Sequence, residues 1–447
     1  MAVKKKKMHI VSLGCPKNQV DAEVMAAALC AAGFENVADE AQAELILVNT
    51  CAFITSAKQE SIYEIFRLAE YKKKGRCGKL VVTGCLPQRY GRTLQKEIPE
   101  ADLFAGTGET GRIAELVRGL DAEPSAPRLV AGPPLFLMDS GCLRLLPPSS
   151  PSAYIKISEG CSNHCSYCVI PSIRGPLRSR SPEDLLKEAR LLAARGVKEL
   201  IVISQDTTAY GRDLPEKPAL PDLLKNIARI PGIRWIRILY AHPAGITDRL
   251  LETIADEDKI CRYLDMPVQH IEDGILRSMN RRIGAAEIRE KISRARQIVP
   301  GIVLRTSLMV GYPGETAAAF GKLLDFVKET GFERLGVFTY SREEGTAAAS
   351  LPGQVAAAEK DRRRNAVMEE QSVVSFRCNQ ALIGSVQEVL VEGPGETPGT
   401  VCGRCRGQAP EIDGATWARG DAAPGDIIPC RITSAETYDL EAEPCVA

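Results

Sequence analysis

The sequence lacks a net charge, a long apolar run and a complete export signal. Its 57 lysines and arginines are balanced by 57 aspartates and glutamates, so no overall charge favours nucleic acid or a membrane surface. No run of about 18 apolar residues is present that could span a bilayer. The lysines at positions 4–7 resemble the start of a signal peptide, but the apolar stretch after them, "MHIVSL", is too short. We therefore expect a cytoplasmic protein without membrane association.

Cysteine, by contrast, is plentiful, with fifteen residues. A reducing cytoplasm keeps most thiols free, so structural disulfides are not expected. Cysteines that recur in a pattern are then best interpreted as metal ligands or catalytic groups, and scattered ones as small buried side chains.

A chain of 447 residues suggests about three domains. In residues 1–120, apolar strands alternate with amphipathic helices, which predicts a parallel α/β sheet with right-handed crossovers. A proline-rich segment at 121–152 predicts a linker. The predicted strands are residues 8–13, 43–50, 78–84 and 101–106, and the predicted helices are residues 18–33, 57–75 and 109–120.

Residues 153–374 repeat the alternation six times. Six strand–helix units predict a barrel-like parallel sheet of the TIM type that stays open, because eight units are needed to close it. In one unit, Ser181 can cap a helix whose first turn holds Pro182. Residues 375–447 have short β-rich pieces and glycine turns, which predict a small antiparallel β-barrel. The six strands are predicted at 153–158, 198–204, 234–240, 261–268, 302–310 and 333–340.

The stretch "EGCSNHCSYCVIPSIRG" places Cys161, Cys165 and Cys168 directly after the first of these six strands. The carboxyl edge of a parallel sheet is where α/β proteins carry their chemistry. Three thiolates can hold three irons of a cubane cluster and leave the fourth iron open. A zinc knuckle completed by His164 is the alternative, and it is less favoured because zinc sites usually contain two local cysteine pairs.

A second set of three cysteines is spread through the first domain. Cys15, Cys51 and Cys85 each follow one of its predicted strands. Carboxyl ends of parallel strands share one sheet edge, so the three thiols can converge if the strands are neighbours. Three unrelated buried cysteines remain the alternative.

Both sets occur in motifs that resemble the methylthiotransferases among the radical S-adenosylmethionine enzymes, in the family's order and over nearly the whole chain. The motifs are "SLGCPKNQVDAE", "NTCAFITSAKQESI", "GCLPQRY" and "SEGCSNHCSYCVIPSIRG". The resemblance implies two 4Fe-4S clusters, one on each set, and a C-terminal TRAM barrel. It also implies that S-adenosyl-L-methionine chelates the open iron and is cleaved to a 5′-deoxyadenosyl radical. Tyr167 lies where the family usually has an aromatic residue.

Four further motifs resemble the RimO branch of this family: "SLGCPKN", "SQDTTAYG", "DMPVQH" and "QAPEIDG". That branch modifies the β-carbon of an aspartate in small-subunit ribosomal protein S-twelve. The resemblance implies that the N-terminal cluster supplies sulfur, a second S-adenosylmethionine supplies methyl, and a donor such as flavodoxin or ferredoxin supplies electrons. Modification of a tRNA adenosine is the alternative within the family. A non-catalytic iron–sulfur or zinc protein that docks on ribosomes is the alternative of another class.

The last domain is acidic. Residues 375–447 contain five arginines and no lysine against eleven acidic residues, among them Glu411, Asp413 and Asp421. Such a module suits a basic protein partner better than RNA phosphates, so no direct nucleic acid substrate is expected. No catalytic residue is assigned, and the pair Cys402 and Cys405 is given no role. Candidates for binding cofactor or substrate at the barrel strand ends are Gln205, Asp206, Gln269 and Arg305.

Overall fold

The computed structural model describes residues 5–120 and 128–445, which divide into two compact units. The first seven residues of the predicted linker, 121–127, lie outside the described residues. Within the described ranges, no helix is both long enough and apolar enough to cross a membrane. The first unit contains the chain up to Leu146 with residues 158–180 and 341–346, and the second contains residues 147–157, 181–340 and 347 onward.

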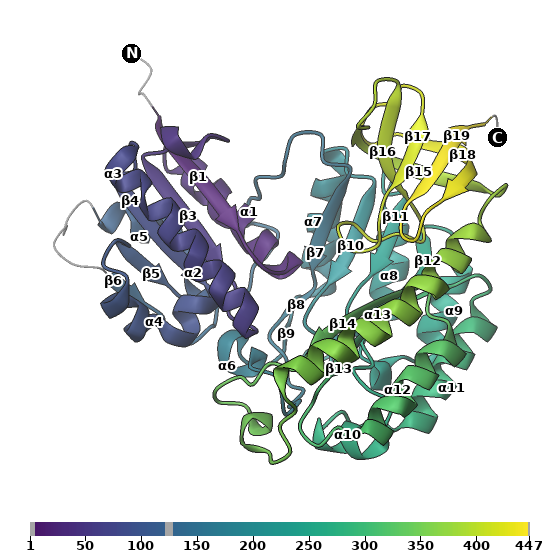
Figure 1. The fold of residues 1–447 in the computed structure, drawn as a ribbon. Helices are drawn as coiled ribbons and strands as arrows, with labels where there is room; N and C mark the ends of the chain where they lie inside the picture. The colour runs from purple at the N-terminus through teal and green to yellow at the C-terminus, as the bar shows by residue number, and fades with distance from the viewer. Residues whose placement is uncertain (1–4, 121–127, 446–447) are drawn as a thin grey trace. The chain divides into compact units, whose positions relative to one another are not determined.

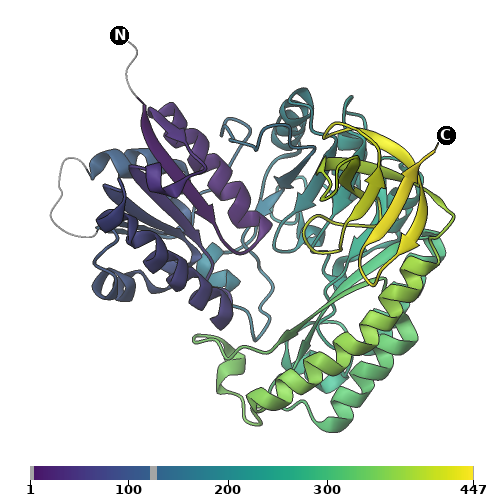
Figure 2. The ribbon, with the colours of Figure 1, turned by 45° about the horizontal axis from the view of Figure 1, so that its top comes forward.

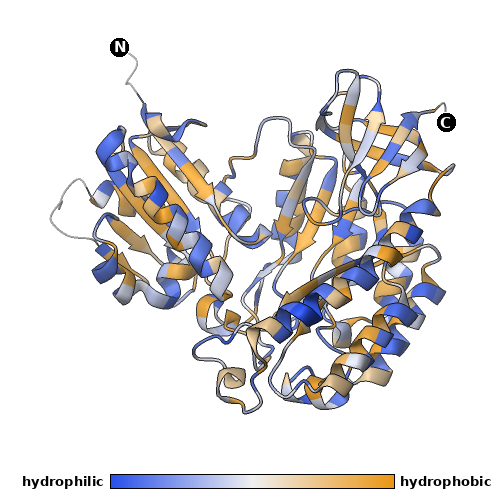
Figure 3. Cartoon of the chain, viewed as in Figure 1, coloured by the Kyte–Doolittle hydropathy of each residue, from blue (hydrophilic) through white to orange (hydrophobic). Residues whose placement is uncertain are grey.

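The first unit is built on a six-stranded parallel sheet in the order β2-β1-β3-β4-β5-β6 (Figure 1). All four predicted strands are present, and the short edge strands β2 and β6 were not predicted. The central strands β3 and β4 are almost entirely buried and strongly apolar (Figure 3), as expected when helices cover both faces. The strands are β1 (Lys6–Ser12), β2 (Phe34–Asn36), β3 (Leu45–Thr50), β4 (Lys79–Gly84), β5 (Leu103–Ala105) and β6 (Arg128–Val130).

Helices cover the two faces of this sheet with separate apolar cores. One core joins the sheet to α1 and α5, and the other joins it to α2 and α4. Helix α4 was not predicted, because Pro87 and Gly91 interrupt its helical pattern. Pro87 lies in the first turn, where proline is tolerated, and a Cβ on Gly91 would lie 2.5 Å from Leu129 Cδ1. The helices are α1 (Pro16–Ala31), α2 (Thr55–Ala69), α3 (Tyr71–Lys74), α4 (Cys85–Glu97) and α5 (Ile113–Gly119).

The second unit contains a six-stranded parallel sheet in the order β7-β10-β11-β12-β13-β14, which confirms the predicted open barrel. Helix α7 begins as predicted: Ser181 Oγ accepts a hydrogen bond from the Asp184 amide, and Pro182 occupies the first turn. The strands are β7 (Ser152–Lys156), β10 (Glu199–Ile203), β11 (Trp235–Ile238), β12 (Ile260–Asp265), β13 (Val303–Val310) and β14 (Arg334–Thr339). The helices are α7 (Pro182–Ala194), α8 (Leu220–Ala228), α9 (Asp248–Asp256), α10 (Asp273–Ser278), α11 (Ala285–Ile298) and α12 (Ala317–Thr330).

The long helix α13 (Ala357–Gln380) leads from this sheet into a closed five-stranded barrel (Figure 2). The predicted small β-barrel is confirmed. Strands β17 and β19 pair in parallel, and the other four pairings are antiparallel. The strands are β15 (Val386–Pro394), β16 (Thr400–Cys405), β17 (Thr416–Arg419), β18 (Ile427–Ala435) and β19 (Leu440–Pro444).

Buried ion pairs attach this C-terminal barrel to the parallel sheet of the second unit. Glu199 on β10 accepts hydrogen bonds from Arg237 Nε at 2.7 Å and from Arg404 Nη2 at 2.5 Å, and all three side chains are buried. Burial opposes ionisation of Glu199, but the two guanidinium groups outweigh it and lower its pKa to about 2. The carboxylate is therefore ionised at neutral pH.

The "QAPEIDG" segment also packs against this sheet, which corrects the expectation for one of its two acids: Asp413 is not available to a partner. Asp413 is only 3% exposed and lies within 3.5 Å of Arg305. Glu411 and Asp421 are exposed as expected. The sequence does not distinguish Asp413 from its neighbours, because the segment has no strand or helix periodicity.

Candidate cysteine sites

The first cysteine set lies at one edge of the sheet in the first unit. Strands β1, β3 and β4 are adjacent in the sheet, and Cys15, Cys51 and Cys85 follow their carboxyl ends. Cys15 is the N-cap residue of α1, and Cys85 is the first residue of α4. Both cysteines therefore lie at the N-terminus of a helix, where backbone amides without helical partners can interact with a bound anionic group.

The electrostatics of these thiols show that they share one environment. Burial, together with the negative charge of Cys85 and Cys15, raises the pKa of Cys51 to about 12. Burial also raises the pKa of Cys85, against the nearby positive charge of Arg174. Thiolates here need a strong compensating positive charge, and a metal centre supplies it while deprotonating its ligands.

Three cysteine side chains are a donor set that suits an iron–sulfur cubane. The thiolates of a cubane each bind a different iron, so they lie farther apart than the ligands of one ion. Soft thiolates are the ligands that iron–sulfur clusters prefer.

The backbone around the first set is fixed by close contacts. Gly14 has a φ of +94°, and a Cβ there would lie 2.7 Å from Cys51 Cβ. Only glycine allows the two cysteine-bearing segments to approach so closely. The Asn18 side-chain amide donates hydrogen bonds of 2.9 Å to the Leu13 and Thr50 carbonyls, which ties the residues before Cys15 to those before Cys51.

The second set lies on a closed loop. Strand β8 (Ser158–Glu159) pairs with β9 (Arg178–Ser179), and α6 (Ile170–Arg174) occupies the loop between them. Two amides point toward sulfur: Asn163 N lies 3.4 Å from Cys161 Sγ, and Ile170 N lies 3.5 Å from Cys168 Sγ. Such backbone donors stabilise cluster thiolates and influence the cluster's reduction potential. Cys165 completes the set of three, and Tyr167, the expected aromatic residue, is buried in this loop.

This loop packs into the first unit together with the first cysteine set. Val169 and Ile173 belong to the same apolar core as Cys85, and the Thr107 hydroxyl donates a 2.8 Å hydrogen bond to the Ile173 carbonyl. The six cysteines proposed from the sequence are therefore brought into one compact unit.

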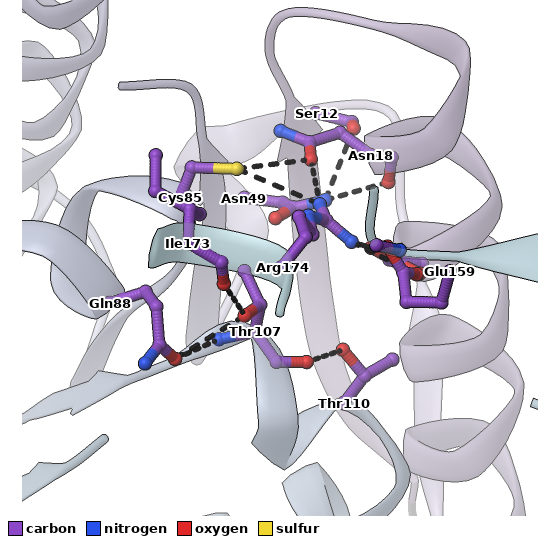
Figure 4. Close-up of polar contacts among 12 residues, drawn as sticks. Ser12, Asn18, Asn49, Cys85, Gln88, Thr107, Thr110, Glu159, Ile173 and Arg174 are labelled. Carbon is purple, nitrogen blue, oxygen red and sulfur yellow. Dashed lines mark hydrogen bonds and ion pairs between the residues drawn. The ribbon is translucent and has the colours of Figure 1, made fainter. Parts of the chain in front are cut away.

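Arg174 connects the loop directly to the first set (Figure 4). Its side chain is buried, and Nη1 lies 2.6 Å from Asp21 and 3.3 Å from Glu159. Its Nη2 donates to Asn18 Oδ1 and lies 3.6 Å from Cys85 Sγ. Sequence reasoning missed this residue, and the only available signal was its place six residues after Cys168.

The barrel candidates lie at different positions in the second unit. Asp206 follows β10 and caps a short helical turn by accepting hydrogen bonds from Thr208. Gln269 has a φ of +70°, and Met309 N donates a 2.7 Å hydrogen bond to its carbonyl. Gln205 directly precedes Asp206 and is half-buried. Gln269 is one of seven non-glycine residues with a positive φ in the described part of the chain, so this conformation alone assigns it no role.

Arg305 has a different environment from these strand-end residues. It lies in the N-terminal half of β13, with Nη1 2.9 Å from Asp265 and Nε 3.5 Å from Asp413. Both carboxylates pair with its guanidinium group. A role in binding cofactor or substrate stays a prediction for all four barrel candidates.

Comparison with known proteins identifies the class. The protein-family model described as the radical SAM superfamily matches residues 155–327. The family model of UPF0004, an uncharacterized protein family, matches residues 7–106, and the family model of the TRAM domain matches residues 383–445. The open parallel barrel and the cysteine loop thus belong to a radical S-adenosylmethionine enzyme, whose cofactors are S-adenosylmethionine and an iron–sulfur cluster.

Full-length relatives then identify the family. A protein of Syntrophus aciditrophicus (strain SB), "Ribosomal protein uS12 methylthiotransferase RimO", is 55% identical, and the match covers 98% of each chain. The protein of the same name from Geobacter sulfurreducens is 52% identical over 99% of each chain. The chain belongs to the RimO family of methylthiotransferases.

Solved structures show the same fold at low identity. The radical S-adenosylmethionine methyltransferase TsrM from Kitasatospora setae, solved with cobalamin and a [4Fe-4S] cluster, has a TM-score of 0.54 at 15% identity. The match covers 90% of this chain and 81% of that one. The radical enzyme OxsB with aqua-cobalamin and S-adenosylmethionine has a TM-score of 0.51, covering 82% of this chain and 56% of that one. At 15% and 11% identity these likenesses support the fold alone.

Proposed function

We propose that this chain adds a methylthio group to the β-carbon of an aspartate in ribosomal protein uS12, the S-twelve protein of the small subunit. The observation that carries this proposal is the presence of two cysteine triads in one compact unit. Group transfer of this kind needs both a radical source and a sulfur source. The names of the full-length relatives support uS12 as the substrate.

We assign one 4Fe-4S cluster to each cysteine triad. Cys161, Cys165 and Cys168 would hold the cluster whose open iron takes S-adenosylmethionine, and Cys15, Cys51 and Cys85 would hold the second. When bound, these groups supply a carbon-centred radical that abstracts hydrogen and a sulfur atom that is inserted in its place.

The chain's own residues contribute orientation and exclusion of water. Cys51 and Cys85 are buried, so sulfur held there is shielded from solvent. The amides of Asn163 and Ile170 stabilise the loop thiolates. At the strand ends of the second unit, Asp206 and Gln269 are candidates for binding cofactor or substrate because hydrogen bonds fix the Asp206 side chain and the Gln269 backbone.

Two partners follow from this proposal. Ribosomal proteins are basic as a class, and the exposed acids of the C-terminal barrel would attract such a protein. Reduction of the loop cluster requires an electron donor such as flavodoxin or ferredoxin.

The proposal is tested by reconstituting the chain with iron and sulfide and measuring both. We expect about eight irons with matching acid-labile sulfide, whereas one zinc would indicate a non-catalytic metal protein. The enzyme is then incubated with S-adenosylmethionine, a reductant and either uS12 or bulk tRNA. Mass analysis should show a methylthio group on an aspartate of uS12 and none on tRNA. The opposite substrate preference would contradict the proposal.

A further inference from the structure

The guanidinium group of Arg174 is placed to act on the first cysteine triad although it belongs to the second triad's loop. It lies at the end of α6, six residues beyond Cys168. Its exposed fraction is 3%, and burying a guanidinium group costs free energy unless every face finds a partner. The groups that contact the Arg174 side chain therefore indicate its role.

The two ends of the guanidinium fork have different partners. The Nη1 end contacts the carboxylates of Asp21 on α1 and Glu159 on β8. These ion pairs neutralise the charge and connect the loop to the N-terminal sheet domain. The Nη2 end instead turns to Asn18 Oδ1 and to Cys85 Sγ, 3.6 Å away (Figure 4).

The contact with sulfur becomes stronger when Cys85 binds a metal. In the thiol form, Cys85 Sγ can donate to Asn18 Oδ1 at 3.7 Å. Ligation removes that proton, so the sulfur becomes an acceptor only. Asn18 Oδ1 then keeps Arg174 as its donor, and Arg174 Nη2 can donate a charge-assisted hydrogen bond to the thiolate.

We propose that Arg174 is a positioning residue that donates a hydrogen bond to the Cys85 thiolate and thereby raises the reduction potential of the cluster held by Cys15, Cys51 and Cys85. Reduction adds negative charge to a cluster, and a cation and an N–H donor at a ligand sulfur stabilise that reduced state. This inference rests on the second cluster of the proposed function.

A purely structural role is the competing explanation, since the same ion pairs hold the loop in place. The reduction potential separates the two, because a loop clamp that never contacts sulfur leaves the potential unchanged. Lysine is the informative replacement: it keeps the charge but lacks the planar fork needed to reach Asp21 and Cys85 together.

The experiment uses the full chain with Cys161, Cys165 and Cys168 changed to alanine, so that the N-terminal cluster alone gives a signal. After reconstitution, the midpoint potential is measured by redox titration followed by electron paramagnetic resonance. In this background R174Q should shift the potential to a more negative value, and R174K should give a smaller shift in the same direction. The matched control is R112Q, which changes an exposed arginine of the same unit that pairs with Glu109 and Glu115. It should leave the potential unchanged.

The outcomes are distinct for the two proposals. If R174Q and R174K keep full iron content and have the same potential as R112Q, the proposed role of Arg174 is overturned. The second cluster of the proposed function is not affected by that result. If R174Q does not retain iron, the R174K potential decides, and a value equal to the parent overturns the inference. Absence of any cluster signal in the parent would overturn the second cluster and this inference with it.

Discussion

The carboxylate of Asp413 accepts a 2.5 Å hydrogen bond from the Tyr263 hydroxyl, which joins the C-terminal barrel to strand β12. The same carboxylate accepts from the Ala409 amide at 2.9 Å and lies 3.5 Å from Arg305 Nε. The Asp413 side chain, which the sequence predicts on an acidic surface, is therefore part of the interior of the second unit. Together with Glu199, Arg237 and Arg404, it makes this barrel an integral part of that unit.

Removing this carboxylate should destabilise the protein strongly. Asp413→Ala leaves a buried hydroxyl and a buried amide without an acceptor and removes one of two carboxylates from Arg305. Breaking a buried ionic network of this kind costs about 3–5 kcal/mol. The measurement is the urea unfolding curve of the cluster-free chain. Asp421→Ala is the control, because Asp421 is exposed and its loss should cost no more than about 0.5 kcal/mol. Equal unfolding midpoints for the two variants would show that the Asp413 contacts contribute nothing.

The cysteine loop should be required for cleavage of S-adenosylmethionine. Changing Cys161, Cys165 or Cys168 to alanine leaves two thiolates, too few to hold a cubane with an open iron for the cofactor. Each variant should lose production of 5′-deoxyadenosine and about half of the iron, while the N-terminal cluster persists. Chromatography of the reduced reaction mixture measures the nucleoside. Normal 5′-deoxyadenosine from any one variant would contradict the assignment of this triad.

The N-terminal triad should be required for product but not for cofactor cleavage. Alanine at Cys15, Cys51 or Cys85 should lower iron by about half and leave 5′-deoxyadenosine production largely intact, with no methylthiolated uS12. Cys77→Ala is a suitable control, since Cys77 is also a buried cysteine of this sheet domain and its Sγ donates a hydrogen bond to the Lys79 carbonyl. It should keep full iron. Full iron content in all three triad variants would show that these cysteines are buried side chains and not cluster ligands.

The sequence was sufficient where a regular pattern carried the information. Apolar alternation located all six barrel strands and four strands of the first sheet, and the rule that parallel strands end at one edge placed Cys15, Cys51 and Cys85 together. It failed at α4, because Pro87 and Gly91 interrupt the helical pattern of a segment whose Leu86 and Leu94 are buried in an apolar core.

Arg174 and Asp413 could not be predicted for a different reason. Each acts through partners that are far away in sequence, 150 residues in the case of Asp413 and Tyr263. Both lie in segments without periodicity, so nothing local separates a buried, paired charge from a solvated one. Arg305 shows the same limit: its guanidinium group pairs with Asp265 and Asp413, which lie far from it in sequence, so these contacts could not be predicted.

Docking of uS12 on the C-terminal barrel can be tested by changing acidic residues that do not support the fold. Asp421, Glu441 and Glu443 are exposed on or beside β17 and β19. Glu443 pairs with Arg419, and this ion pair is itself exposed. Exposed pairs of this kind contribute about 0–1 kcal/mol, so changing these residues should not unfold the barrel.

Reversing the three acids to lysine should weaken uS12 binding and lower the yield of modified protein. The neutral variant, with asparagine at 421 and glutamine at 441 and 443, should lie between it and the wild type. Production of 5′-deoxyadenosine without substrate should be the same in all three, because neither cysteine triad is touched. Wild-type affinity should also fall as salt is added, since exposed charges are screened over about 8 Å at physiological ionic strength.

If RNA were the substrate, added lysines would instead tighten binding to tRNA phosphates. Unchanged uS12 affinity in the lysine variant would exclude this surface as the docking site, and methylthiolation of tRNA by the wild type would exclude uS12 as the sole substrate.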